Sequence, residues 1–255
     1  MSAGEAPWWV ALYDDVLADV LLERGPDAVS DTLGFLTQAL GLRPGHTVFD
    51  QCAGIGSLSV PLAKAGMRVV SIEQAPHYVD RARAWAAREG VELQALVGDA
   101  FELASPIACR AAFNWWTGFG YADSDRQNAR MLARAFDSLV PGGAFVIDWL
   151  NVPQILSSFS PRVVTQQNTA QGVVTLTRDS VLCLERGRLE KTWSFVTPSG
   201  ERVERHSQVR LYLPHQLGEL LQQVGFEDLS YWGDVSGAEL GADSPRCIVR
   251  ARRPR

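Results

Sequence analysis

Apolar runs and amphipathic segments alternate along the middle of the chain. Five short apolar runs predict buried strands, and segments whose apolar residues recur every three or four positions predict helices between them. Strands that are apolar along their whole length are typical of a parallel sheet with helices on both faces, joined by right-handed crossovers. We therefore predict a doubly wound, Rossmann-like α/β sheet, with strands at residues 47–50, 67–72, 91–97, 109–115 and 143–149 and helices at residues 57–65, 76–88 and 125–139.

The pattern changes after residue 149. Short turns marked by glycine separate runs that predict antiparallel strands at residues 163–165, 173–184, 189–197 and 202–213. A helix at residues 214–224 and strands at residues 226–232 and 247–251 follow. We expect four parts: a helical N-terminal segment or lid (1–45), an α/β core (46–150), an antiparallel β insertion on the substrate side (151–213) and a C-terminal part that completes the core sheet (214–255).

The composition argues against several classes of function. The chain has 255 residues and a net charge of −5, whereas a nucleic-acid binder usually needs a basic surface to hold phosphates. The four cysteines lie far apart and form no Cys/His cluster, so we expect no metal site and a reducing compartment. No apolar run reaches the ~18 residues of a membrane span, and the N-terminus lacks the basic stretch of a signal peptide. We expect a cytoplasmic protein without nucleic-acid or membrane partners; whether it forms a homo-oligomer stays open.

Three successive strand ends carry residues that suit a nucleoside. Gly54 and Gly56 follow the first strand, where glycine lets the backbone approach a ligand at the carboxyl edge of the sheet. Glu73 ends the second strand, 19 residues beyond Gly54, and an acid there can accept hydrogen bonds from both ribose hydroxyls. Asp99 follows the third strand and can accept from an adenine amino group. The alternative is that the glycines only form turns and the acids only cap helices.

Two cofactors fit an acid after the second strand: a nicotinamide dinucleotide and S-adenosylmethionine. The dinucleotide fingerprint ends in glycine or alanine, and Ser59 occupies that position here. Asp50, at the end of the first strand, suits a cationic sulfonium with its ammonium group better than it suits a pyrophosphate. These observations favour S-adenosylmethionine.

Residues 47–150 resemble a class I S-adenosylmethionine-dependent methyltransferase. The glycine motif, Glu73, the segment 98–100 and the segment 139–143 match that class in order and spacing, and residues 113–121 are similar to a stretch in bacterial small-molecule methyltransferases. That group includes many N-methyltransferases of amino sugars, amino acids and peptide termini, and its members often carry an antiparallel insertion after the fifth strand. Two positions depart from the pattern: Cys52 replaces the usual first glycine, and Arg110 stands where an acid usually begins the fourth strand.

The resemblance implies a cofactor site in which the loop after the first strand holds the methionine part and the next two strand ends hold the ribose and the adenine. The implied contacts are Asp50, Ala53, Gly54, Gly56, Glu73, Gln74, Asp99, Ala100, Phe101, Asn114 and Trp115.

The acceptor side is predicted from aromatic residues near the same edge, because aromatic walls stabilise a cationic centre. Packing in the core is the alternative for each of them. For the proton, the candidates are His206, on a strand whose alternation also presents Arg210, and Tyr13 in the N-terminal segment. The predicted acceptor contacts are Trp8, Trp9, Trp116, Phe119, Tyr121, Trp149, Asn151 and Arg210.

We therefore expect an S-adenosylmethionine-dependent methyltransferase of a small molecule, favouring an amine nitrogen, in specialised natural-product metabolism such as antibiotic biosynthesis. An O-methyltransferase that uses His206 or Tyr13 is the alternative within the class. An NAD(P)-dependent oxidoreductase and a binding module that holds S-adenosylmethionine without turnover are the alternatives from other classes.

Overall fold

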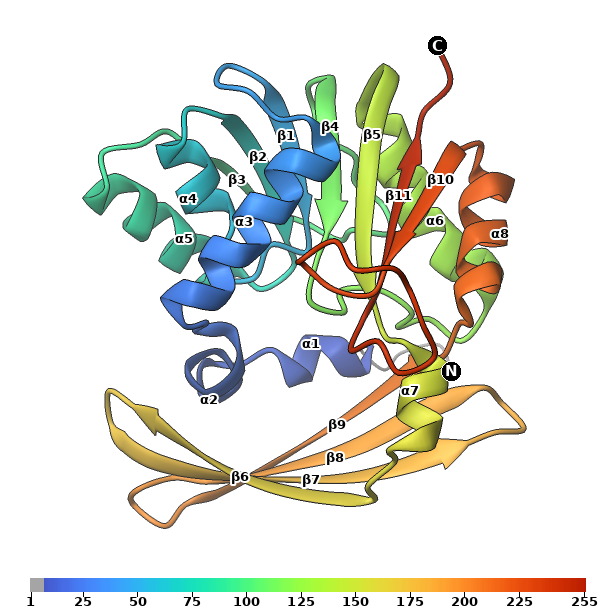
Figure 1. Cartoon of the computed structure of the whole chain (residues 1–255). Helices are drawn as coiled ribbons and strands as arrows, with labels where there is room; N and C mark the ends of the chain where they lie inside the picture. The colour runs from blue at the N-terminus through green and yellow to red at the C-terminus, as the bar shows by residue number, and fades with distance from the viewer. Residues whose placement is uncertain (1–6) are drawn as a thin grey trace.

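The computed structural model describes residues 7–255, so the first six residues of the predicted N-terminal segment lie outside the described part (Figure 1). Its main layer is a seven-stranded sheet in the order β10-β11-β5-β4-β1-β2-β3. The first five strands of the chain run parallel, and β11 is antiparallel to both of its neighbours. The strands are β1 (Thr47–Gln51), β2 (Arg68–Glu73), β3 (Gln94–Val97), β4 (Cys109–Asn114), β5 (Leu139–Trp149), β10 (Glu227–Trp232) and β11 (Cys247–Arg252).

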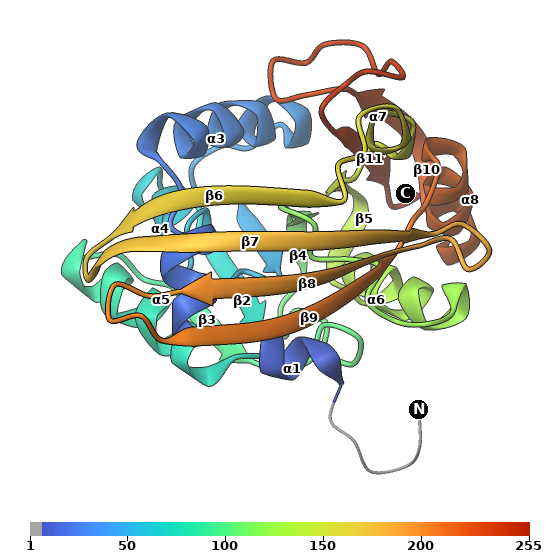
Figure 2. The same cartoon turned by 90° about the horizontal axis from the view of Figure 1, so that it is seen from below.

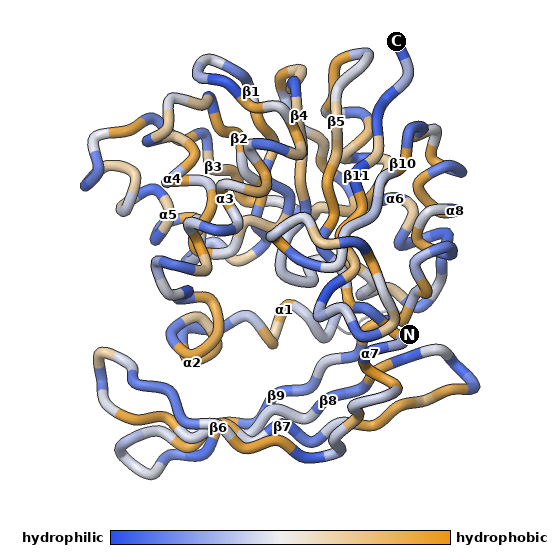
Figure 3. Tube along the Cα trace, viewed as in Figure 1, coloured by the Kyte–Doolittle hydropathy of each residue, from blue (hydrophilic) through white to orange (hydrophobic). Residues whose placement is uncertain are grey.

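Helices cover both faces of this sheet. Alternate residues of β1 divide between two apolar clusters: Val48 packs with α3 (Pro26–Leu40) and α4 (Ser59–Lys64), and Phe49 packs on the other face with α6 (Asp125–Asp137) and α8 (Pro214–Val224). Helix α5 (Pro76–Arg88) contacts α4, the strand β2 and the edge strand β3. Strands buried on both faces need apolar side chains at every position, which explains the apolar stretches visible along β4 and β5 (Figure 3).

The position of β1 fixes where a ligand can bind. Strand β1 pairs with β2 on one side and with β4 on the other, so the chain reverses its direction of travel across the sheet at this point. Ligands of open α/β sheets bind at the carboxyl ends of the strands beside such a switch point. In Figure 1 these ends face α1 (Trp8–Leu12), α2 (Asp15–Leu17) and the π-helical turn η1 (Ala18–Leu22).

A second, four-stranded antiparallel sheet lies beyond these short helices (Figures 1 and 2). It packs through Leu176 and Phe195 onto Leu17 and Val20 of the N-terminal segment. The short helices are thereby held between the two sheets, over the carboxyl edge of the main one. The strands are β6 (Arg162–Thr169), β7 (Gly172–Cys183), β8 (Arg188–Val196) and β9 (Arg202–Arg210).

The predicted fold class is confirmed, and the differences concern the ends of elements. The segment before Gln94 is a loop rather than part of β3, and β5 begins four residues earlier than predicted, at Leu139. Helix α7 (Val152–Ser157) was not predicted, because six residues with a proline in the first turn give no clear periodicity. Strand β6 extends to Thr169 because one face of the second sheet is open to water and accepts polar side chains. The four-part division of the chain stays a prediction.

We predict that Phe195→Ala lowers the free energy of unfolding by about 3–5 kcal/mol, because it leaves a cavity in the contact between the second sheet and the N-terminal helices. Val164→Ala, at an exposed position of β6, is the matched control and should change the free energy of unfolding by no more than about 0.5 kcal/mol. Urea unfolding of both variants measures the difference. Equal effects would contradict this packing.

Candidate functional site

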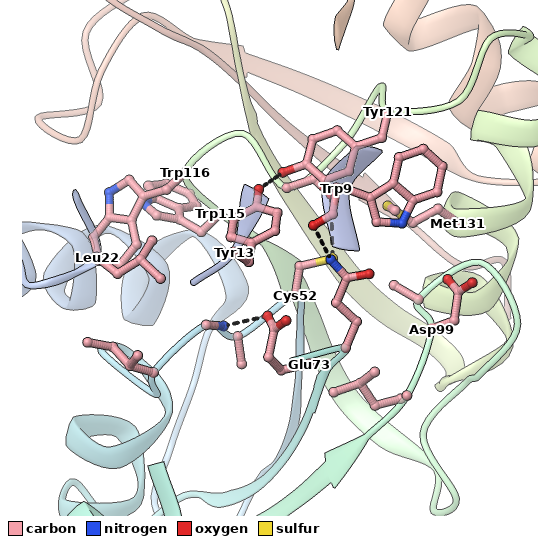
Figure 4. Close-up of a pocket in the computed structure, with 18 of the residues that line it drawn as sticks. Trp9, Tyr13, Leu22, Cys52, Glu73, Asp99, Trp115, Trp116, Tyr121 and Met131 are labelled. Atoms are coloured by element: carbon pink, nitrogen blue, oxygen red, sulfur yellow. Dashed lines mark hydrogen bonds between the residues drawn. The ribbon is translucent and has the colours of Figure 1, made fainter. Parts of the chain in front are cut away.

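A cavity lies at the carboxyl edge of the main sheet, beneath the N-terminal helices (Figure 4). Its walls come from the loop after β1, the end of β2, the loop after β3, the turn after β4 and the segment from α1 to η1. The lining residues are Trp9, Tyr13, Leu22, Cys52, Ala53, Gly54, Ile55, Ser57, Ile72, Glu73, Gln74, Gly98, Asp99, Ala100, Phe101, Trp115, Trp116, Gly118, Tyr121 and Met131.

The loop after β1 turns tightly through left-handed backbone conformations. Gly54 has φ +54° and lines the cavity, as the sequence predicts. Gly56 has φ +84°, but it lies outside the lining, and a Cβ there would come within 2.9 Å of the Cβ of Ala82 in α5. In this structure Gly56 allows the close packing of the loop on α5, and its cofactor contact stays a prediction. Cys52 adopts φ +64°, so it takes the conformation that a glycine would favour at this position.

Glu73 is the central acid of the cavity. Its two carboxylate oxygens accept hydrogen bonds from the backbone N–H groups of Gly54 and Ala75, each at 3.0 Å. Figure 4 shows the bond from Gly54. Burial raises the pKa of Glu73, and these two N–H donors oppose the increase. The carboxylate is fixed against the loop after β1 and lines the cavity, where its remaining lone pairs can accept from ligand hydroxyls.

The neighbouring strand end supplies the second acid. Asp99 Oδ1 accepts from the backbone N–H of Phe101 at 2.8 Å, and both residues line the cavity together with Ala100. Gln74 Nε2 donates to the carbonyl of Trp9 at 3.1 Å and so ties α1 to the end of β2. Asp99 can accept a hydrogen bond from an adenine amino group, and the apolar and aromatic walls beside it suit the faces of an adenine ring.

Two predicted cofactor contacts lie behind the cavity. Asp50 is buried and accepts from the hydroxyl of Ser59 at 2.6 Å, and it does not line the cavity. Asn114 is fully buried and donates to Gln51 Oε1 at 3.2 Å and to the carbonyl of Gly118 at 3.1 Å. These hydrogen bonds shape the adjacent loops, and neither side chain lines the cavity; the contact of both residues with the cofactor stays a prediction. Trp115 does line the cavity.

The turn after β4 is strained. Trp116 and Thr117 have φ +54° and +69°, which non-glycine residues rarely adopt and which surrounding contacts must enforce. Asp148, at the end of β5, accepts from the backbone N–H of Trp116 at 3.0 Å, and Arg246 pairs with Asp148 through two hydrogen bonds of 2.6 and 2.8 Å. Arg246 also donates to the hydroxyl of Thr117 at 3.0 Å. The sequence analysis missed this buried pair; the only signal was an acid in an apolar strand.

Aromatic side chains close the cavity from the N-terminal side. The Tyr13 hydroxyl contacts the Tyr121 hydroxyl, and the Trp9 ring lies 5.7 Å from Phe101 and 6.0 Å from Tyr121 between centroids (Figure 4). Burial raises the pKa of both tyrosines above the ordinary range. The cavity has a volume of about 80 Å³, below the roughly 300–1,000 Å³ of small-molecule sites, so a nucleoside can enter only when this aromatic cover moves.

Three predicted acceptor residues have structural roles instead. Phe119 and Trp149 are fully buried and pack edge to face at 5.4 Å beside Tyr212. Asn151 is buried, and its side-chain amide donates to the carbonyls of Gly241 and Ser244 at 2.9 and 2.8 Å. These side chains belong to the core and to a loop contact, so the core alternative considered for the aromatic residues holds for Phe119 and Trp149.

His206 and Arg210 lie on the wrong face of the second sheet for a role in this cavity. His206 is exposed, with Thr192 Oγ1 3.2 Å from its Nδ1, and Arg210 pairs with Asp125 of α6. The alternate residues of β9 face the N-terminal helices, where Arg205 pairs with Asp14. A shift of one residue in a strand moves a side chain to the opposite face, and the sequence did not specify which face turns inward.

The predicted residues that the structure brings together at the cavity are therefore those of the loop after β1, of the next two strand ends and of the aromatic cover. The cavity also includes residues that the sequence analysis did not assign to it, among them Leu22, Ile55 and Met131, which carry no polar or periodic signal. Among residues 7–255, no three His, Cys, Asp or Glu side chains are grouped so that they could hold a metal ion. No helix in that same range is long and apolar enough to span a membrane.

Comparison with known proteins finds a family match over part of the chain. Residues 48–143 match a family model described as "Methyltransferase domain". An uncharacterized protein of Mycobacterium tuberculosis is 35% identical over 89 residues, which are 35% of this chain and 30% of that protein. The chain thus matches about a third of the length of this curated relative.

Two solved structures are similar over nearly the whole chain. The CcbJ methyltransferase from Streptomyces caelestis is 19% identical with a TM-score of 0.79, covering 95% of this chain and 98% of that one. The S-adenosylmethionine-bound amino pentose methyltransferase CalS10 from Micromonospora echinaspora is 16% identical with a TM-score of 0.67, covering 91% and 93%. At these identities the likeness concerns the fold.

The family match over residues 48–143 and the Rossmann-like fold agree with a class I S-adenosylmethionine-dependent methyltransferase domain. The predicted enzyme class and cofactor are confirmed at this level, and the dinucleotide alternative is set aside.

We predict that Glu73→Gln weakens binding of S-adenosylmethionine at least 10-fold, because hydrogen bonds to a charged acceptor contribute about 1.5–3 kcal/mol. Calorimetric titration measures the change. Glu89→Gln, at an ion pair with Lys64 on the surface, is the control and should leave the affinity unchanged. The role of Glu73 would be refuted by equal affinities of the wild type and Glu73→Gln.

Asp50 provides a prediction on pH. Burial raises its pKa to about 7, whereas a carboxyl group in an unfolded chain titrates near ~3.9. The folded state therefore holds this proton more tightly, and the stabilisation that follows is present at low pH and lost as the pH rises toward 7. Urea unfolding at a series of pH values should show a smaller loss of stability between pH 4 and 7 for Asp50→Asn than for the wild type. A larger loss in the variant would count against a protonated Asp50.

Proposed function

We propose that this protein transfers a methyl group from S-adenosylmethionine to an amine nitrogen of a small molecule, in natural-product metabolism. The observation that carries the choice of nitrogen is the chemistry of the cavity wall beside the turn after β4. Trp115, Trp116, Tyr13 and Tyr121 form that wall, and the two acids of the lining, Glu73 and Asp99, are placed at the ends of β2 and β3. A histidine is absent from the lining, which is drawn from residues 7–255.

The two tyrosines are poor bases. Burial raises the pKa of Tyr13 and of Tyr121, so neither hydroxyl gives up its proton near neutral pH. A hydroxyl acceptor needs a base within hydrogen-bond reach, whereas a neutral amine attacks with its own lone pair and becomes an ammonium ion as the new bond forms. A cavity wall whose tyrosines cannot act as a base therefore favours an amine over a hydroxyl group as the methyl acceptor.

The cofactor supplies an electrophilic methyl group on a positively charged sulfur. The residues of this chain would bind and orient it: Glu73 would accept from the ribose hydroxyls, Asp99 would accept from the adenine amino group, and Gly54 leaves room for the backbone to approach. Trp115 and Trp116 would exclude water and stabilise positive charge through their ring faces. A dry wall also disfavours the protonated form of the acceptor amine, which keeps its lone pair available.

The description of CalS10 as an amino pentose methyltransferase of calicheamicin biosynthesis supports an amine-bearing natural product as acceptor. The aromatic cover would close over the bound molecules and hold the nitrogen in line with the methyl carbon and the sulfur. Closure would follow entry, because the cover must first move to admit the cofactor.

The test is a turnover assay with labelled S-adenosylmethionine against a panel of amino sugars and other amines, each paired with an analogue in which a hydroxyl replaces the amine. We expect methyl transfer to the amines alone, at a rate that rises with pH as the acceptor loses its proton. Transfer only to the hydroxyl analogues would favour the O-methyltransferase. Binding of S-adenosylmethionine without any methylated product across the panel would favour a binding module.

We predict that Tyr13→Phe lowers kcat/KM for an amine acceptor by less than about 10-fold and leaves the pH–rate profile in place, because the phenol acts in packing and not as a base. Loss of a general base costs about 10²- to 10⁴-fold. Steady-state kinetics over a range of pH decide whether the Tyr13 phenol acts in packing or as a general base. A loss of that size together with a displaced profile would restore Tyr13 as the catalytic base.

A further inference from the structure

The inward face of the second sheet carries a polar cluster. In the strand register, Arg178 of β7 lies opposite Trp193 of β8, and Lys191 lies between Ser180 of β7 and Ser207 of β9. These five residues share one face, because alternation along each strand is strict. The same face continues into Leu176 and Phe195, which are buried against the N-terminal helices. The cluster therefore faces the carboxyl edge of the main sheet (Figure 1).

The two cations of this cluster have no carboxylate partner. Arg178 lies 6.0 Å and the Lys191 ammonium 5.3 Å from the centre of the Trp193 ring. Within residues 7–255 neither one takes part in an ion pair, and the Arg178 Nε is buried without a hydrogen-bond partner. The adjacent acids Asp179 and Glu190 belong to the opposite face by the same alternation, and Asp179 pairs there with Arg162.

This positive charge is partly withdrawn from water. Burial lowers the pKa of Lys191 to about 8, and the positive charges of Arg178 and Arg246 lower it further. A buried cation is expensive unless it is paired, so the cluster favours a ligand that supplies negative charge. The hydroxyls of Ser180 and Ser207, on either side of Lys191, could donate to the same ligand.

A second cavity lies against this cluster. It has a volume of about 570 Å³, and its lining includes Trp8, Ser180, Lys191 and Ser207 together with Asp179 and Glu190, whose side chains belong to the opposite face by the strand alternation. Trp8 packs at 5.0 Å against Tyr121, which lines the first cavity. The indole Nε1 of Trp8 is buried without a hydrogen-bond partner, so it is a further donor available to a ligand.

Two further arginines, Arg246 and Arg24, bring positive charge close to the first cavity. Arg246, which holds the strained turn, lowers the pKa of Lys191 and also that of Arg24. Arg24 lies 4.9 Å from the centre of the Trp116 ring, and Trp116 lines the first cavity. Trp8, which lines the second cavity and packs on Tyr121 of the first, is the aromatic contact between the two cavities.

We propose that the second cavity binds the methyl acceptor, and that Lys191 in its wall and Arg178 beside it, on the same Trp193 ring, hold an oxyanionic group of the acceptor, a carboxylate or a phosphate. The proposal rests on the proposed function, since it assigns the acceptor to this cavity. An arginine fork binds either oxyanion through two parallel hydrogen bonds, and the lysine adds a point charge. The acceptor would thus carry its amine at one end and a negative group at the other.

The chain offers a direct reporter of this site, because Lys64 and Lys191 are its only two lysines. Lys64 is paired with Glu89 on the surface and serves as the internal reference. NMR of lysine-labelled protein, titrated separately with inorganic phosphate and with acetate, should shift the Lys191 side-chain signal saturably and raise the pKa of Lys191, while Lys64 shifts little. A stronger response to phosphate or to acetate identifies the kind of oxyanion.

Arg178→Gln should weaken the response of Lys191 to the effective anion at least 10-fold. Arg162→Gln, in β6, is the matched control, because Arg162 pairs with Asp179 on the opposite face of the sheet, and it should leave the response unchanged. The proposal is overturned if neither anion acts on Lys191, if Lys64 and Lys191 respond equally, or if the two variants behave alike. The measurement needs no turnover, so its failure is distinct from a failure of the methyl-transfer assay.

Discussion

The packing of the second sheet onto the N-terminal helices is the contact on which the candidate site depends. Phe195 and Leu176 supply the apolar surface that holds α1, α2 and η1 over the carboxyl edge of the main sheet. Without this contact the loop after β1 and the ends of β2 and β3 would face open water. The aromatic cover formed by Trp9, Tyr13 and Tyr121 can therefore close only because the insertion lies behind it.

Buried charge gives the site its second constraint. The buried Asp148 pairs with the partly exposed Arg246. The turn is held by the hydrogen bond from the Trp116 N–H to Asp148 and by the bond from Arg246 to the Thr117 hydroxyl. Pairs of this kind contribute little net stability, because desolvation offsets most of the attraction. Their effect here is geometric: they force an unfavourable backbone conformation that places Trp116 in the wall of the first cavity.

The sequence predicted the main sheet and the loops at its carboxyl edge well, because local signals specify both. Apolar runs fix buried parallel strands, and the positions of Gly54, Glu73 and Asp99 follow from where those strands end. The acceptor side was predicted less well. The residues proposed for it come from β7 and β8, far along the chain from the loop after β1, and a strand can present either face to the core.

His206 and Lys191 illustrate that second difficulty. Both lie on strands of alternating polarity, and only the register of the folded sheet turns Lys191 inward and His206 outward. Trp149 and Phe119 were misassigned for a related reason, since an aromatic residue beside a strand end suits a ligand wall and a core equally well. Nothing in the local sequence distinguishes the two before the chain is packed.

The most direct test of the account is hydrogen exchange with and without S-adenosylmethionine, followed by mass spectrometry. The account predicts that the cofactor increases the protection of residues 8–22 and of the loop at residues 52–56, because the aromatic cover closes on a ligand bound at the carboxyl edge. Protection that changes only at the opposite edge of the main sheet, or on the outer face of the second sheet, would contradict it.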